Sequence, residues 1–160
     1  EIINGIKTGR HLQYFVNPII NVTFKAAFVH RLTNERLEDH PKFHEIAEDI
    51  IEFIGDSKIV AHNANFDRRI LNNELERAGW EPFPKSQFID TLEIARYLYP
   101  KMKAYNQDAL CVKFGIDNKQ RMKTNLHSAM EDCILLYHIY REMLEDLKRK
   151  NMNAEIFCSI

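Results

Sequence analysis

The sequence predicts an α/β layered fold with an antiparallel hairpin at its front. Two observations predict the layers: short apolar strands are expected at residues 58–62 and 88–90, and a helical pattern follows each of them. The third observation is the extended character of residues 1–16, which is typical of a hairpin. A chain of 160 residues suits one domain with a single core.

The expected hairpin occupies the start of the chain. Residues 11–16, closed by Asn17-Pro18, should pair with residues 1–4 through a turn region from Gly5 to Gly9. Residues 19–38 show no clean periodicity, so we expect no regular element there.

Two amphipathic helices are expected next. The first can be capped by Asp39 and is stopped by Gly55. The second follows the strand at 58–62 and can be capped by Asn63 or Asn65. The apolar face expected of the first comprises Phe43, Ile46, Ala47, Ile50 and Ile54. That of the second comprises Phe66, Ile70, Leu71, Leu75 and Ala78.

The second half of the chain continues the alternation. In order, we expect a loop at 80–86, a strand at 88–90, and helices at 92–99, 106–114 and 128–150. Two prolines mark the loop, and Pro100 and Gly115 end two of the helices. Residues 1–150 then form the domain, and residues 151–160 form a frayed tail.

Composition excludes several classes of protein. A net charge of -1 gives no global attraction to nucleic acid, so binding to a polyanion must come from local charge or metal ions. Cys111, Cys133 and Cys158 are odd in number and lack metal-site spacing, which favours scattered reduced thiols. No apolar stretch approaches the roughly 20 residues of a membrane helix, so we expect a cytoplasmic protein without membrane contact.

The run from Ile59 to Asp67 indicates an apolar strand that delivers a carboxylate onto the first turn of a helix. An enzyme can expose a metal ligand at the edge of a sheet in this way. Alone, Asp67 could be only a favourable charge against the helix dipole. A second stretch with the same setting strengthens the interpretation as a metal ligand.

That second stretch runs from His127 to Asp132. Ser128 and Glu131 have the spacing of a capping box, which places His127 just outside the helix. Inside one helix, His127 and Asp132 would lie roughly 140° apart, whereas a helix that begins at Ser128 lets both reach one site. A neutral histidine can take a proton from water, and a carboxylate is a hard ligand for Mg²⁺ or Mn²⁺. Alone, His127 would more often be a surface or packing histidine.

Five motifs together resemble a known family. They are His62-Asn63-Ala64-x-Phe66-Asp67, Asp90-Thr91-Leu92-x-x-Ala95-Arg96, Asp108-Ala109-Leu110-Cys111, Gly115-Ile116-Asp117 and His127-Ser128-Ala129-x-x-Asp132. In order and spacing they resemble the 3′–5′ exonucleases that use three Asp, one Glu and a histidine, and most closely the epsilon (proofreading) subunits of bacterial DNA polymerase III. The resemblance covers residues 1–145 and implies a ribonuclease-H-like mixed sheet flanked by helices.

The resemblance implies roles for individual residues. Asp67 and Asp132 match metal ligands, and His127 matches the general base that activates the attacking water. The positions expected to support the site or the substrate are His62, Asn63 and His30. The family uses two divalent ions, Mg²⁺ or Mn²⁺, to hydrolyse phosphodiester bonds at single-stranded DNA 3′ ends, and its proofreading members bind the DNA polymerase III catalytic subunit.

One motif of the family has no counterpart in this chain. The first motif, Asp-x-Glu-Thr-Thr-Gly on the first central strand, should precede Glu1, and neither its Asp nor its Glu occurs here. Because Glu1 belongs to the next strand, we expect a chain truncated at its N-terminus that is weakly active or inactive alone.

Two other readings stay open. One is a related exonuclease such as an oligoribonuclease or ribonuclease T, because Arg31 replaces the usual Gly after His30. The other is a non-enzymatic remnant that only binds a polymerase partner or nucleic acid.

Overall fold

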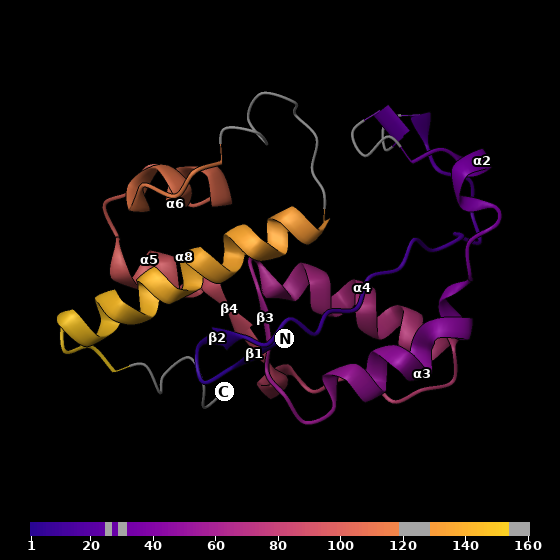
Figure 1. Cartoon of the computed structure of the whole chain (residues 1–160), viewed down its shortest axis with the longest axis horizontal. Helices are drawn as coiled ribbons and strands as arrows, with labels where there is room; N and C mark the ends of the chain where they lie inside the picture. The colour runs from indigo at the N-terminus through magenta and orange to yellow at the C-terminus, as the bar shows by residue number, and fades with distance from the viewer. Residues whose placement is uncertain (25–26, 29–31, 119–128, 154–160) are drawn as a thin grey trace.

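The structure, a computed structural model, describes residues 1–24, 27–28, 32–118 and 129–153, and it has the α/β architecture that the sequence predicts. Two parallel strands, β3 (Ile59–Ala61) and β4 (Phe88–Asp90), lie at the centre of Figure 1. Helices α5, α6 and α8 pack together on one side of them, and α3 and α4 pack together on the other.

The N-terminal hairpin is present, but it is tighter than expected. Strand β1 (Ile2–Ile3) pairs antiparallel with β2 (Ile6–Lys7). The turn consists of Asn4 and Gly5, whose φ angles of 52° and 78° are both positive, as a two-residue hairpin turn of type I′ requires. The expected partner strand at 11–16 was therefore wrong.

Residues 11–16 form no strand because other parts of the chain hold them. The Tyr14 hydroxyl donates a hydrogen bond to Asp49, and the backbone N–H of Asn17 donates to the carbonyl of Pro41 at 2.9 Å. The segment thus runs along α3 (Phe43–Ile54) instead of returning to the hairpin. A short helix, α2 (Asn34–Leu37), interrupts the stretch expected to be irregular.

The start of α3 corrects a second expectation. Its N-cap residue is Lys42, not Asp39, and the Glu45 carboxylate accepts the backbone N–H of Lys42 at 2.7 Å. This is the half of a capping box that an acidic side chain in the first turn supplies. Gly55, with a φ of 48°, ends the helix as expected.

Helix α4 (Ala64–Arg77) packs on α3 and β4, and it buries only part of the face that was expected, since Leu71 and Ala78 are half-buried. Leu75 is fully buried, but Phe66 and Ile70 are 51% and 47% exposed. The buried face instead includes Asn72, whose side chain pairs with both backbone groups of Phe83 at 2.9 and 3.1 Å. Those two bonds hold the 80–84 loop, which precedes a 3₁₀ turn at Lys85–Gln87.

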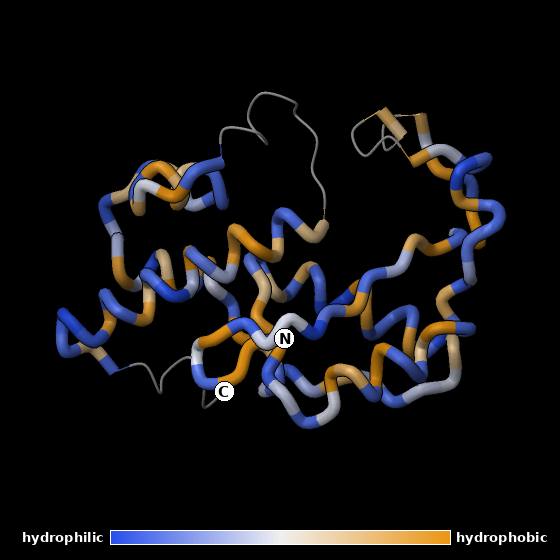
Figure 2. The backbone as a smooth tube through the Cα atoms, viewed as in Figure 1, coloured by the Kyte–Doolittle hydropathy of each residue, from blue (hydrophilic) through white to orange (hydrophobic). Residues whose placement is uncertain are grey.

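The main core lies between α5 (Thr91–Leu98), α6 (Gln107–Phe114) and α8 (Ala129–Arg149). Hydrophobic residues recur among hydrophilic ones along α8 (Figure 2). The core residues are Ile89, Ile94, Ala95, Leu98, Tyr99, Leu110, Cys111, Leu135, Ile139, Met143 and Leu147. The expected strand at 88–90 and the helix closed by Gly115, which has a φ of 66°, are both confirmed.

The hairpin and the core are connected by α8. The Tyr137 hydroxyl donates to the carbonyl of Gly5 at 3.1 Å, which ties the hairpin to the middle of the helix. Among the described residues, Cys111 and Cys133 are not in disulfide bonds, and Cys158 lies outside the described residues. The described helices include none with the length and apolar character needed to cross a membrane.

Candidate active site

The site is built at the carboxyl edge of the β3–β4 pair. Because the strands are parallel and Ala61 is in register with Asp90, the residues that follow β3 leave the sheet beside the end of β4. His62 and Asn63 form the connection, and α4 begins at Ala64. Asp67 consequently lies in the first turn of α4, at the edge where the two strands end.

Asn63 turns the chain without capping the helix that follows. It is the N-cap residue by position and has the left-handed conformation, with φ 68° and ψ 51°, but its side chain makes no capping hydrogen bond. The expectation that Asn63 or Asn65 caps α4 was therefore wrong. The Asp90 carboxylate caps α4 in its place: it accepts hydrogen bonds from the backbone N–H groups of Asn63 and Ala64, each at 2.9 Å.

His62 is enclosed by protein groups. Its Nδ1 lies 2.9 Å from the Thr91 hydroxyl oxygen, and the ring also hydrogen-bonds to the backbone of Tyr105. Burial lowers the pKa of His62, an effect that the Tyr105 bond and the charges of Asp90 and Asp67 oppose. The ring is thus held at the exit of β3 by neighbours on both sides.

The carboxyl of Asp67 is partly desolvated and close to a second acid. Burial raises its pKa, its own backbone N–H lowers it, and the negative charge of Asp90 raises it further. His62 has a smaller opposing effect. The three side chains therefore form one electrostatic group at the edge of the sheet.

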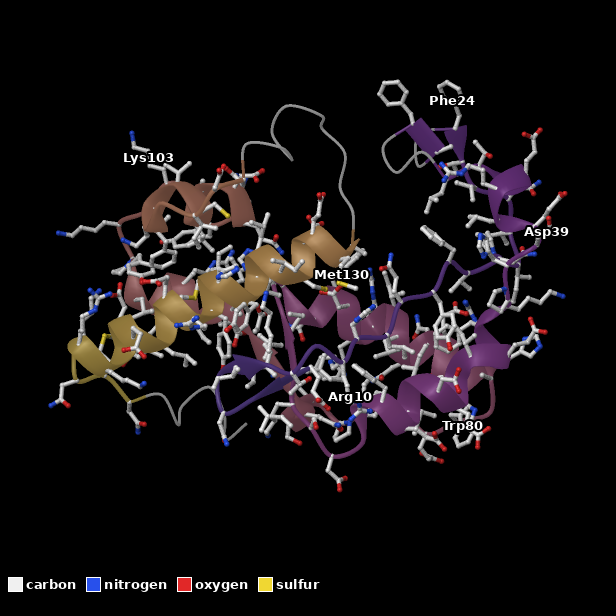
Figure 3. The ribbon with its side chains drawn as sticks, in the orientation of Figure 1. Arg10, Phe24, Asp39, Trp80, Lys103 and Met130 are labelled. Carbon is white, nitrogen blue, oxygen red and sulfur yellow. The ribbon has the colours of Figure 1, made fainter. Side chains whose placement is uncertain are left out.

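Asp132 lies in the first turn of α8, close to that group. Burial raises the pKa of the neighbouring Cys133 thiol, and the charges of Asp132 and Asp67 both add to the increase. The charge of Asp67 therefore reaches Cys133, and Figure 3 labels Met130 at this same end of α8. The Oδ1 atom of Asp132 is buried. Acids in the first turns of α4 and α8 thus act on one thiol.

Two of the expected site residues, His127 and His30, lie outside the described residues, as does the expected capping box at Ser128. Sequence reasoning quoted Asp90 in a motif but assigned it no role. Its capping role could have been predicted from its position directly between a strand and a helix, because Asp is favoured as an N-cap residue.

Two carboxylates of the site offer donors that suit divalent metal ions. Asp67 and Asp132 supply hard carboxylate oxygens, which suit Mg²⁺ or Mn²⁺. Across residues 1–24, 27–28, 32–118 and 129–153, no group of three or more His, Cys, Asp and Glu side chains is arranged to hold a metal ion. Asp67 and Asp132 are therefore the right type of ligand for such an ion, but two carboxylates are too few to complete its site.

Comparison with known proteins gives consistent results. The sequence profile of a family described as "Exonuclease" matches residues 1–140. DNA polymerase III subunit epsilon of Rickettsia felis is 43% identical over 146 residues, which are 89% of this chain and 62% of that protein. The same subunit of Rickettsia conorii is 42% identical over 147 residues, or 90% of this chain and 62% of that protein. The chain thus spans about three fifths of the length of these relatives.

A solved structure has a similar fold. It is described as Exonuclease X in complex with 5′ overhanging duplex DNA, and it superposes with a TM-score of 0.68 at 26% sequence identity. The match covers 99% of this chain and 84% of the other. The likeness therefore extends over the whole arrangement of strands and helices described above.

Proposed function

The chain belongs to the exonuclease family, and from that premise we propose that its residues 1–150 form the 3′–5′ exonuclease domain of an epsilon-type proofreading subunit. The observation that carries this proposal is that Asp67 and Asp132, each in the first turn of its helix, both act by their charge on the Cys133 thiol. Asp67 and Asp90, from distant parts of the sequence, lie at the carboxyl edge of a parallel strand pair, where α/β folds place their sites.

We propose that Asp67 and Asp132 are ligands of two divalent metal ions, Mg²⁺ or Mn²⁺. Bound ions of this kind would polarise the scissile phosphate and stabilise the leaving oxygen. The sequence contains no Asp-x-Glu, so its own carboxylates supply only part of the ligand set. The two aspartates would hold the ions from the side of α4 and α8.

We assign His127 as the general base, because a histidine can take a proton from water near neutral pH. His62, Asn63 and His30 are assigned supporting roles. The neighbours of His62 favour such a role, since Thr91 and the Tyr105 backbone already engage its ring. Asn63 supports the site through its backbone, which turns the chain from β3 into α4.

The proposed substrate is the 3′ end of single-stranded DNA, and the proposed partner is the catalytic subunit of DNA polymerase III in the cytoplasm. The names of the Rickettsia subunits and of the DNA-bound Exonuclease X favour DNA over RNA. An oligoribonuclease-type activity and a purely binding role are the alternatives, and the same assay separates them from the proposal.

The test is a nuclease assay on 5′-labelled single-stranded DNA and RNA. It compares the chain extended at its N-terminus by a strand that carries Asp-x-Glu with Asp67→Asn and Asp132→Asn variants of that extended form. We expect metal-dependent shortening of DNA from the 3′ end, and a loss of at least about 100-fold in each variant. Asp39→Asn, a matched change at an exposed acid far from the site in Figure 3, should leave the rate unchanged.

Faster shortening of RNA than of DNA would favour the oligoribonuclease alternative. Binding of either nucleic acid without any shortening by the extended form would favour a purely binding role. Equal rates for Asp67→Asn, Asp132→Asn and Asp39→Asn would remove the two aspartates from the reaction.

A further inference from the structure

The Asp90 carboxylate caps two helices at once. Its Oδ1 accepts the backbone N–H groups of Asn63 and Leu92, both at 2.9 Å, and its Oδ2 accepts that of Ala64 at 2.9 Å. Leu92 is in the first turn of α5, which directly follows Asp90, whereas Asn63 and Ala64 begin α4, 27 and 26 residues earlier. One side chain therefore fixes the starts of both helices.

The cap on α4 is supplied from outside that helix. The first N–H groups of a helix have no partner within it, and an N-cap side chain normally accepts one of them. The Asn63 side chain does not do so, and a charged acceptor on the neighbouring strand takes its place. Hydrogen bonds to a carboxylate are stronger than neutral ones, and a negative charge at this end also suits the helix dipole.

Thr91, the first residue of α5, makes two further contacts with the chain at the end of β3. Its hydroxyl lies 3.2 Å from the carbonyl oxygen of Ala61, to which it donates, and 2.9 Å from His62 Nδ1. Asp90 and Thr91 together thus contact four successive residues, 61–64, which carry the chain from β3 into α4.

We infer that Asp90, assisted by Thr91, is a positioning residue that holds the first turn of α4 and thereby sets where the Asp67 carboxylate lies at the carboxyl edge of the β3–β4 pair. Asp67 follows Ala64 by three residues in the same turn, so the conformation at 63–64 determines where its carboxylate lies. The inference rests on the proposed function for the role of Asp67 itself. The competing explanation is that Asp90 is only the N-cap of α5.

The two explanations differ in what Asp90→Asn would change. An asparagine keeps an oxygen for Asn63 and Leu92, but its NH₂ group would face the N–H of Ala64 and lose that bond. Asn106→Ala is a matched control, because it removes a single N-cap bond, to Ala109 at 2.9 Å, from α6. Both changes should lower stability, and only the first should alter the position of Asp67.

The experiment measures binding of Mn²⁺ alone to the 160-residue chain by calorimetry, together with amide hydrogen exchange. Mutation of groups that orient a metal ligand typically weakens metal affinity 10–100-fold, so we expect at least about a tenfold loss for Asp90→Asn. Amide exchange at residues 63–67 should accelerate in the same variant. Asn106→Ala should keep the affinity within about twofold while it melts at a lower temperature.

Equal losses of affinity in Asp90→Asn and Asn106→Ala would overturn the inference, because stability alone would then explain both. If Asp90→Asn does not fold, Thr91→Val and Thr91→Ser decide: the valine should weaken Mn²⁺ binding, and the serine, which keeps the hydroxyl, should restore it. Equal affinities in those two variants would also overturn the inference.

Asp67→Asn separates this inference from the proposed function. If that variant binds Mn²⁺ as well as the unaltered chain does, the proposed function fails. The exchange rates of Asp90→Asn then decide the positioning role alone: faster exchange at residues 63–67 supports it, and unchanged rates overturn it.

Discussion

Asp67 and Asp90 lie at the same edge of the β3–β4 pair, and the charge of Asp90 adds to the effect of burial in raising the pKa of Asp67. Asp67 and Asp90 have different roles at this edge. Asp90 accepts three backbone N–H groups, whereas Asp67, in the first turn of α4, offers a carboxylate of the kind that suits a divalent metal ion. Without a metal ion, burial and the charge of Asp90 both disfavour the ionised form of the Asp67 carboxyl.

Asp67→Asn should therefore stabilise the metal-free chain at neutral pH. A raised folded-state pKa means that the stability contributed by Asp67 is present below its unfolded value and is lost as the pH rises through the folded value. The neutral asparagine avoids that loss, so its melting temperature at pH 7 should exceed that of the unaltered chain. Thermal unfolding at pH 7 in EDTA checks this, with Asp39→Asn as control, and a lower melting temperature would contradict it.

His62 should make stability fall in mild acid. Burial lowers its folded-state pKa, so the stability it contributes is complete above the unfolded value of 6.5 and is lost as the pH falls from there through the folded value. In His62→Gln, which can keep polar contacts without titrating, the free energy of unfolding should depend less on pH between about 5 and 7.

Urea unfolding across that pH range measures the difference for His62→Gln. The same substitution at the exposed His44 is the matched control. Curves for His62→Gln that parallel those of the unaltered chain would show that His62 does not titrate differently on folding.

Tyr99 should contribute to stability through a buried contact between α5 and α8. Its hydroxyl donates to Asp146 at 2.6 Å, and burial followed by this bond raises the pKa of the phenol well above its usual value. Tyr99→Phe should cost about 1–2 kcal/mol, because it removes the donor to the Oδ2 atom of the partly buried Asp146, whose Oδ1 still accepts from Arg149. Tyr14→Phe breaks a similar bond to Asp49 at an exposed site and should cost less than about 0.5 kcal/mol in urea unfolding. Equal costs would contradict the importance of burial.

The sequence predicted correctly those elements whose ends are set by residues nearby in the chain. Gly55 and Gly115 end their helices at positive φ, and the apolar run at 88–90 forms β4 as expected. The capping role of Asp90 toward α4 could not be predicted in this way. It depends on the register between β3 and β4, which pairs Ala61 with Asp90 and so brings the Asn63 backbone N–H within 2.9 Å of the Asp90 carboxylate.

The wrong expectations for residues 11–16 and for the apolar face of α4 have the same physical origin, which is contact with distant parts of the chain. An apolar run at 11–16 fits a strand by composition, but contacts of Tyr14 and Asn17 with residues 38–49 hold it along α3. Phe66 and Ile70 have helical spacing, yet the packing of α4 on α3 and β4 buries Leu75 and leaves both of them exposed. The periodicity of a sequence predicts an apolar face of a helix, but the elements that pack against the helix determine which of its residues are buried.

His127 should be essential for the reaction if it is the base. In the chain extended by an Asp-x-Glu strand, His127→Ala should lower kcat by roughly 10²–10⁴ and leave the melting temperature unchanged. His44→Ala, on the exposed side of α3, is the matched control. A rate for the unaltered extended form that does not vary between pH 6 and 9 would remove His127 from this role.

The chain without an Asp-x-Glu strand should shorten DNA little or not at all. Asp67 and Asp132 can retain a weak single metal site, but in-line displacement needs ions on both sides of the phosphate. We therefore expect the 160-residue form to bind Mn²⁺ and yet to trim a labelled oligonucleotide at least about 100-fold more slowly than the extended form does. Both forms are assayed on the same substrate after matched purification, with Asp67→Asn as the background. Robust metal-dependent trimming by the 160-residue form would show that the described carboxylates suffice, and the mechanism would then have to proceed without the first motif.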